Sequence, residues 1–236
     1  MERRLLLERL VQELGGRFST SLSIDLSHTD PSEVFKWFLA SILYGARISV
    51  DIATKTYKEF ERRSLLTPKA ILDAGWDGLV EALDAGGYTR YDFKTATKLL
   101  TVVEELLKRY DGDLNKLHRS ALDPRDLERR LKDLGKGIGD VTVNIFLREL
   151  RGLWEKADPL PSSLEILAAQ KLGLIDPKSG GERREILESL KEAWREIDPT
   201  GKRFPEFEAA LVRFARELRR KGKYGKALTE RYCKDP

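Results

Sequence analysis

Apolar residues recur every three or four positions along most of the chain, as they do on one face of an α-helix. Between Glu2 and Leu14 this spacing predicts a first helix, which Gly15-Gly16 ends. The run Phe35 to Leu43 is apolar nearly all round, so it predicts a central buried helix. Phe18 to His28 alternates only loosely and predicts a loop or a short extended segment.

Further helices follow from the same periodicity and from helix-start signals. Thr67-Pro68 and Gly75-Trp76-Asp77 each predict the start of a short helix. No segment shows the strict alternation that is typical of a strand, so the predicted fold class is all-α. The longer predicted helices cover 50–61, 91–110, 124–134, 140–150, 159–172, 182–197 and 205–221.

The composition is that of a globular protein with a heavily charged surface. A chain of 236 residues, of which 35% are charged, suits one large domain or two small lobes. No apolar run approaches the length of a membrane span, and the N-terminal segment contains acids, unlike a signal peptide. We therefore expect a cytoplasmic protein with no membrane partner, nucleoid-associated in a prokaryote. The net charge of +4 permits nucleic-acid binding.

Metal-ligating residue types are scarce in this sequence. The single cysteine, Cys233, excludes an intramolecular disulfide and a cysteine-rich metal cluster. His28 and His118 lie far apart and lack the spacing of zinc ligands. We therefore expect no metal and no cofactor.

A glycine-dense pentapeptide, Gly135-Lys136-Gly137-Ile138-Gly139, separates two helix-period segments. Glycine permits positive φ and close approach of the backbone to another molecule. Gly139 would then lead into the N-terminus of the second helix, where unpaired N–H groups favour an anion. The pentapeptide predicts either a phosphate-binding hairpin or a plain helix–helix turn.

One helix and a short loop further on stands Asp158, followed by Pro159. An aspartate before a proline predicts the N-cap and the first residue of a helix over 159–172.

The order hairpin, helix, aspartate resembles the helix-hairpin-helix DNA glycosylase superfamily, whose members are related to endonuclease III. The resemblance covers roughly 31–173 and includes the run 35–43 and Gly86-Gly87-Tyr88. It implies that Asp158 is catalytic and that the hairpin residues Lys136, Gly137, Ile138, Gly139 and Thr142 hold a DNA phosphate. The four cysteines that hold an iron–sulfur cluster in many members are missing here.

The resemblance also implies two helical lobes and a site between them. Residues 31–151 would form a six-helix barrel-like lobe that includes the hairpin, and residues 1–30 with 152–236 would form the second lobe. The partner would be double-stranded DNA with a damaged base, bound by a monomer. A flipped base must be held against flat side chains, and another side chain fills the gap that it leaves. The candidates for these two tasks are Tyr44, Arg47, Tyr88, Arg90, Tyr91 and Trp154.

Several functions remain open at this point. Bifunctional members carry a lysine where this chain has Val141, so we expect a monofunctional glycosylase that uses water as nucleophile. The alternatives are a glycosylase with lyase activity that uses a displaced lysine (Lys136, then Lys171), a non-catalytic DNA-binding protein, and a helical protein-interaction module. A basic run over 219–226 could add phosphate affinity.

Overall fold

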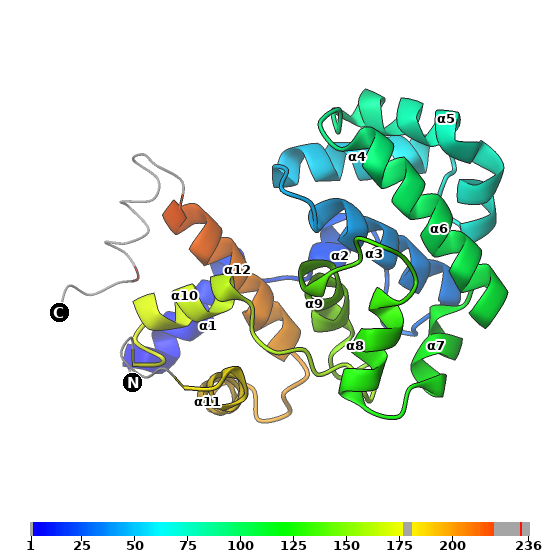
Figure 1. Cartoon of the computed structure of the whole chain (residues 1–236). Helices are drawn as coiled ribbons and strands as arrows, with labels where there is room; N and C mark the ends of the chain where they lie inside the picture. Colours follow the sequence, from blue (N-terminus) through cyan, green and yellow to red (C-terminus); the bar gives the residue numbers. More distant parts are fainter. Residues whose placement is uncertain (1, 177–180, 220–231, 233–236) are drawn as a thin grey trace. The chain divides into compact units, whose positions relative to one another are not determined.

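The computed structural model describes residues 2–176, 181–219 and 232. This part of the chain is all-α, as predicted, and its one β-feature is an isolated bridge between Arg151 and Trp154 (Figure 1). Within the described residues, no helix has both the length and the apolar character that crossing a membrane demands. The helices are α1 (Glu2–Leu14), α2 (Phe18–Ser21), α3 (Pro31–Tyr44), α4 (Val50–Arg62), α5 (Pro68–Gly86), α6 (Asp92–Tyr110), α7 (Leu114–Ser120), α8 (Pro124–Lys132), α9 (Asp140–Leu150), α10 (Ser163–Lys171), α11 (Arg183–Arg195) and α12 (Phe204–Arg219).

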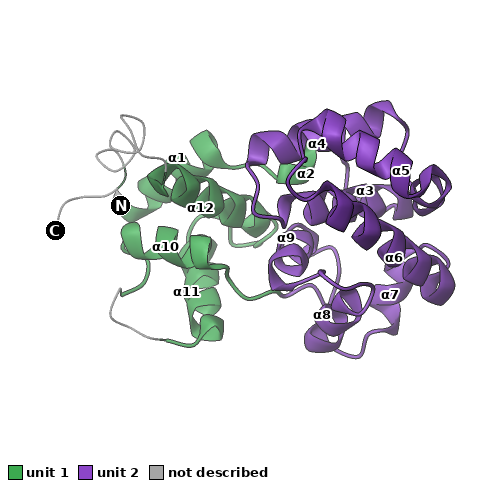
Figure 2. Cartoon of the chain, turned by 45° about the horizontal axis from the view of Figure 1, so that its top comes forward, with its two compact units in different colours: residues 1–21, 159–236 green, residues 22–158 purple. Residues whose placement is uncertain are grey.

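The chain divides into two compact units, which Figure 2 shows in different colours. Unit 1 consists of residues 1–21 and 159–236, and unit 2 consists of residues 22–158. The predicted lobes had their boundaries at 30/31 and 151/152. The division found here places the whole segment between α9 and Asp158 in unit 2, together with the hairpin.

Unit 2 is built around α3, which packs against α4, α7 and α9. Nine consecutive or near-consecutive side chains of α3 are buried, which confirms the predicted central helix. The Trp37 indole N–H donates to the carbonyl oxygen of Phe146 on α9 at 3.1 Å, and the rings of Phe38 and Phe146 meet edge to face. The core therefore fixes α9, the second helix of the hairpin, to the centre of the unit.

Local signals set the ends of several helices. Asp30 caps α3 by accepting from the Ser32 N–H. The two short helices predicted after Thr67 and at Gly75 are the two arms of α5, which kinks where Gly75 adopts a φ of 64°.

The prediction of a loop or extended segment over 18–28 is wrong at its start, because residues 18–21 form the single helical turn α2. Arg213 of α12 lies 4.0 Å above the Phe18 ring and donates to three carbonyl oxygens between Leu14 and Gly16. This contact joins positions nearly 200 residues apart, so local sequence could not reveal it.

Unit 1 has its own core, made by α1, α10 and α12 with α11 against α12. The ring planes of Trp194 and Phe207 stack at 4.9 Å in this core. Most of the predicted basic run, from Arg220 onward, and Cys233 lie outside the described residues.

Candidate functional site

The glycine-dense segment is the tight connection between α8 and α9. Gly137 has a φ of +95°, a conformation that favours glycine, and the Ile138 N–H donates to the Gly135 carbonyl at 3.1 Å. The Ile138 side chain is buried and anchors the turn, whereas Lys136, Gly137 and Gly139 are exposed. The tight turn between two helices that the sequence predicts is therefore present.

The three glycines of the turn differ in whether the surrounding structure requires a residue without a side chain. A Cβ added at Gly135 would lie 2.8 Å from Val102 Cγ2, and one added at Gly137 would lie 2.9 Å from Lys98 Cε. Because Lys98 and Val102 are one turn apart on α6, the first two glycines let the turn lie closely along this helix. Gly139 has a φ of −111°, and an added Cβ there would meet no atom within 4 Å. Neither a positive φ nor a close contact therefore requires glycine at position 139.

Gly139 is the N-cap of α9, and no side chain caps this helix. The first turn is open to solvent on one side: the Asp140 side chain is 90% exposed and forms an ion pair with Lys132, and Val141 is 61% exposed. An uncapped, exposed helix N-terminus attracts anions through its N–H groups and the helix dipole. The carboxylate of Asp140 is offset by Lys132.

Lys98 adds a positive charge beside the turn, and sequence analysis missed it. Partial burial lowers the pKa of the Lys98 ammonium, because desolvation disfavours the charged form. Among the described residues no carboxylate forms an ion pair with it. Nothing in its local sequence distinguishes it from the other lysines of α6; only the packing against Gly137 does.

Asp158 is not a helix cap, which corrects the prediction. Helix α10 begins at Ser163, and a capping box formed by Ser162 and Glu165 sets its start. Ser162 and Glu165 match the capping-box pattern, and this signal prevails over Asp158-Pro159. The Asp158 side chain is 27% exposed and forms an ion pair with Arg151, whose side chain is buried.

The segment that carries Asp158 is fixed to α7. The Trp154 indole N–H donates to Asn115 Oδ1 at 3.0 Å, and its ring stacks on His118 at 4.6 Å. Lys156 Nζ donates to the His118 carbonyl oxygen at 3.2 Å. Burial lowers the pKa of His118, because desolvation disfavours the imidazolium. These contacts hold the backbone just before Asp158.

Two of the predicted base-stacking residues are core residues. Tyr88 is fully buried, and its hydroxyl donates to the Leu43 carbonyl at 2.8 Å. Trp154 is 3% exposed and lies between His118 and Phe146. The expectation of open ring faces at these positions is wrong, because the rings complete the packing around α3, α7 and α9.

The other candidates remain near the surface. Arg47 is exposed on the α3–α4 loop, and Tyr44 at the end of α3 shares a hydrogen bond of 2.7 Å with Thr54. Arg90 lies over the Tyr91 ring at 5.4 Å.

The α3–α4 loop lies beside the first turn of α9. Thr142 of that turn is buried, and its Oγ1 would be 2.2 Å from a Cβ added at Gly45 in the loop. Thr142 therefore serves packing, while the loop that carries Arg47 is brought next to the hairpin.

The described residues contain no group of three or more His, Cys, Asp or Glu side chains placed to hold a metal ion. No protein-family model matches this chain, and no curated protein matches it either.

Proposed function

We propose that the chain binds double-stranded DNA through the α8–α9 hairpin and excises a damaged base as an N-glycosylase of the helix-hairpin-helix superfamily. The observation that carries the proposal is Gly139: it is exposed, caps α9 without a side chain, and has free space around the position of a Cβ. A glycine that neither φ nor close packing requires leaves room for a ligand backbone to approach closely.

Asp158 supplies the chemistry in this proposal. Cleavage of the glycosidic bond passes through a cation-like sugar, which a carboxylate stabilises. The ion pair with Arg151 orients the carboxylate, and the contacts of Trp154 and Lys156 fix the backbone next to it. With valine at position 141, water is the nucleophile, and the product is a free base and an intact abasic strand.

Two observations favour a second function, non-catalytic DNA binding. The Asp158 charge is already balanced by Arg151, and the rings of Tyr88 and Trp154 are closed off by the core. A protein that only grips the DNA backbone needs neither an unpaired carboxylate nor an open ring.

Single-turnover excision on a panel of duplex oligonucleotides, each with one damaged base, distinguishes the two functions. We expect release of at least one base, and a loss of about a hundredfold or more in rate for Asp158→Asn, as for removal of one electrostatic stabiliser. DNA affinity should persist in this variant, because a negative charge is removed. Excision by Asp158→Asn at the wild-type rate would refute the catalytic role. A panel without any released base, with DNA affinity intact, would support the binding protein.

A further inference from the structure

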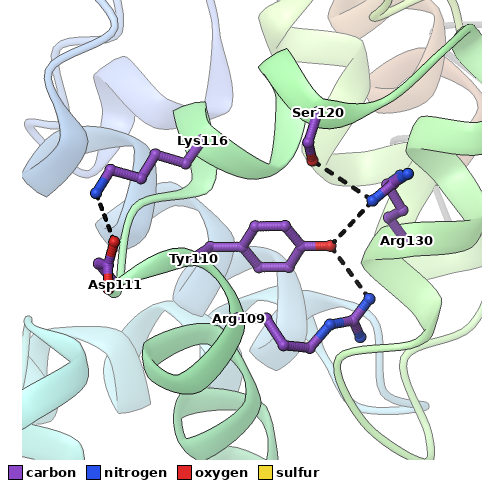
Figure 3. A pocket seen from close by; sticks show the side chains of 6 residues that line it. All are labelled: Arg109, Tyr110, Asp111, Lys116, Ser120 and Arg130. Carbon is purple, nitrogen blue, oxygen red and sulfur yellow. Dashed lines mark hydrogen bonds and ion pairs between the residues drawn. The ribbon is translucent and has the colours of Figure 1, made fainter.

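A pocket of about 470 Å³ opens in unit 2 at the C-terminal end of α6, beside α7 and α8 (Figure 3). Its volume is within the range of sites that bind small molecules or parts of larger ones. Its lining includes neither Asp158 nor any residue of the hairpin turn. Its lining consists of Arg109, Tyr110, Asp111, Lys116, Ser120 and Arg130.

The lining is positively charged. Three of the six residues are cations, and the one acid, Asp111, is offset by Lys116 at 2.7 Å. The guanidinium groups of Arg109 and Arg130 converge on the Tyr110 hydroxyl oxygen, at 3.2 Å and 3.5 Å (Figure 3). Two cations that share one neutral acceptor retain donor capacity for a stronger one.

Arg130 is held in place by an ion pair with Asp126. Its Nε donates to Asp126 at 2.8 Å, and Asp126, which is buried, also accepts from Arg129 and from the Leu122 N–H. The hydrogen bonds from Arg130 and from the Leu122 N–H lower the pKa of Asp126 to about 2, so this carboxylate is ionised at neutral pH. The Nη1 of Arg130 is left with contacts of 3.5 Å to Tyr110 and Ser120 in the pocket.

Arg109 links the pocket to the hairpin. Its Nη1 donates to the Asp133 carbonyl oxygen at 3.5 Å, two residues before Gly135. Lys98 and Arg109 are eleven positions apart in α6, which is close to three full turns, so they share one face of the helix and lie about 16 Å apart along it. The pocket is therefore on the side of α6 along which the hairpin turn lies.

We propose that this pocket binds a phosphate group, with the guanidinium groups of Arg109 and Arg130 as the main donors. Guanidinium groups match the geometry of phosphate oxygens and bind them through paired, charge-assisted hydrogen bonds. The phosphate belongs either to a DNA strand or to a free nucleotide. The pocket does not depend on glycosylase activity, so its test is independent of the proposed function.

Arg109→Gln is the decisive variant, and Lys108→Gln is its matched control. Both side chains are exposed and adjacent on α6, but only Arg109 lines the pocket. Binding of inorganic phosphate and of thymidine 5′-monophosphate is measured by calorimetry at constant ionic strength, with chloride as the reference anion. We expect saturable binding by the wild type and by Lys108→Gln, and at least about tenfold weaker binding by Arg109→Gln. Arg109→Lys should have an intermediate phosphate affinity, because it keeps the positive charge but loses the paired N–H donors of the guanidinium group.

The salt dependence of duplex binding then identifies the source of the phosphate. If the source is DNA, Arg109→Gln reduces the slope of log affinity against log salt by about one, and Lys108→Gln leaves it unchanged. If the slope is unchanged while free-phosphate binding is lost, the ligand is a free phosphate compound. Equal phosphate binding by the wild type and Arg109→Gln, with both variants folded by circular dichroism, would overturn the proposal.

Discussion

The two glycines at the end of the hairpin turn should respond to alanine in opposite ways. Gly137 has a φ of +95°, and its Cβ would meet Lys98 Cε at 2.9 Å, so the fold needs glycine there. Gly139 has an extended conformation and free space around it, so the fold tolerates a side chain. Comparison of the two alanine variants therefore separates an effect on folding from an effect on ligand binding.

The expected effects on stability can be worked out from this geometry. Gly137→Ala places alanine at positive φ, which costs about 1–2 kcal/mol and lowers Tm by about 2–8 °C for a chain of this size. For Gly139→Ala, the smaller entropy of the unfolded chain stabilises by about 0.4–1 kcal/mol. A poorer N-cap offsets a few tenths of a kcal/mol or more of this gain. We therefore expect a Tm within about 2 °C of the wild type.

DNA affinity should change in the stability-neutral variant. In the proposed complex, a methyl group at position 139 would stand between a phosphate oxygen and the N–H groups of the first turn of α9. The loss of one hydrogen bond to a charged group is worth about 1.5–3 kcal/mol, or about 10- to 150-fold in Kd. The loss should be equal for damaged and undamaged duplexes, because phosphate contacts carry no sequence information.

Fluorescence anisotropy with a labelled duplex, at fixed salt, measures this effect. Gly78→Ala is the matched control, since its Cβ would make only an ordinary contact of 3.5 Å, within α5 and outside the hairpin. It should bind DNA as the wild type does. If Gly139→Ala is folded and binds DNA with wild-type affinity, the hairpin is only a connector.

Three further outcomes are expected. Val141 is 61% exposed, so Val141→Lys should fold normally and form some covalent adduct with abasic DNA under borohydride, whereas efficient trapping by the wild type would refute the monofunctional mechanism. Lys98→Met should raise Tm, because it removes a desolvated charge, and should weaken duplex binding; tighter binding would contradict the role of Lys98. His118 has a lowered pKa, so folding favours its neutral form, and stability in urea should fall as pH drops below 6.5. His118→Phe keeps the stacking on Trp154 and should flatten this dependence; an unchanged slope would assign it to other groups.

Periodicity and helix-start signals predicted most of the fold because these signals act within one helix. The all-α class, the buried α3, both arms of α5 and the α8–α9 connection all followed from local spacing. The start of α10 did not, because two start signals compete over 158–165 and the sequence cannot weigh them. The capping box prevails, since it satisfies two backbone N–H groups at once.

The candidate site was predicted only in part, because side-chain exposure depends on partners far away in sequence. Tyr88 and Trp154 are near turn signals that suggest a surface, but each finds a hydrogen-bond acceptor on another helix and joins the core. Arg151 forms an ion pair with Asp158, but no sequence motif marks it as the partner of this aspartate. The roles of Asp158 and of the hairpin stay predictions until the experiments above are done.

Lys98 separates the two interpretations of the hairpin. A turn that only joins α8 to α9 needs a side chain that fills space beside Gly137, and a methionine or leucine would do this without desolvating a charge. The chain instead places an ammonium there, and no ion pair among the described residues compensates its burial. A conflict of this kind between local stability and residue choice is typical of functional sites. A phosphate bound at the hairpin would resolve the conflict, because its charge would stabilise the ammonium while the N-terminus of α9 donates to its oxygens. In the proposed complex, Lys98 on α6 and Gly139 at the start of α9 would thus favour the same phosphate through two independent physical effects.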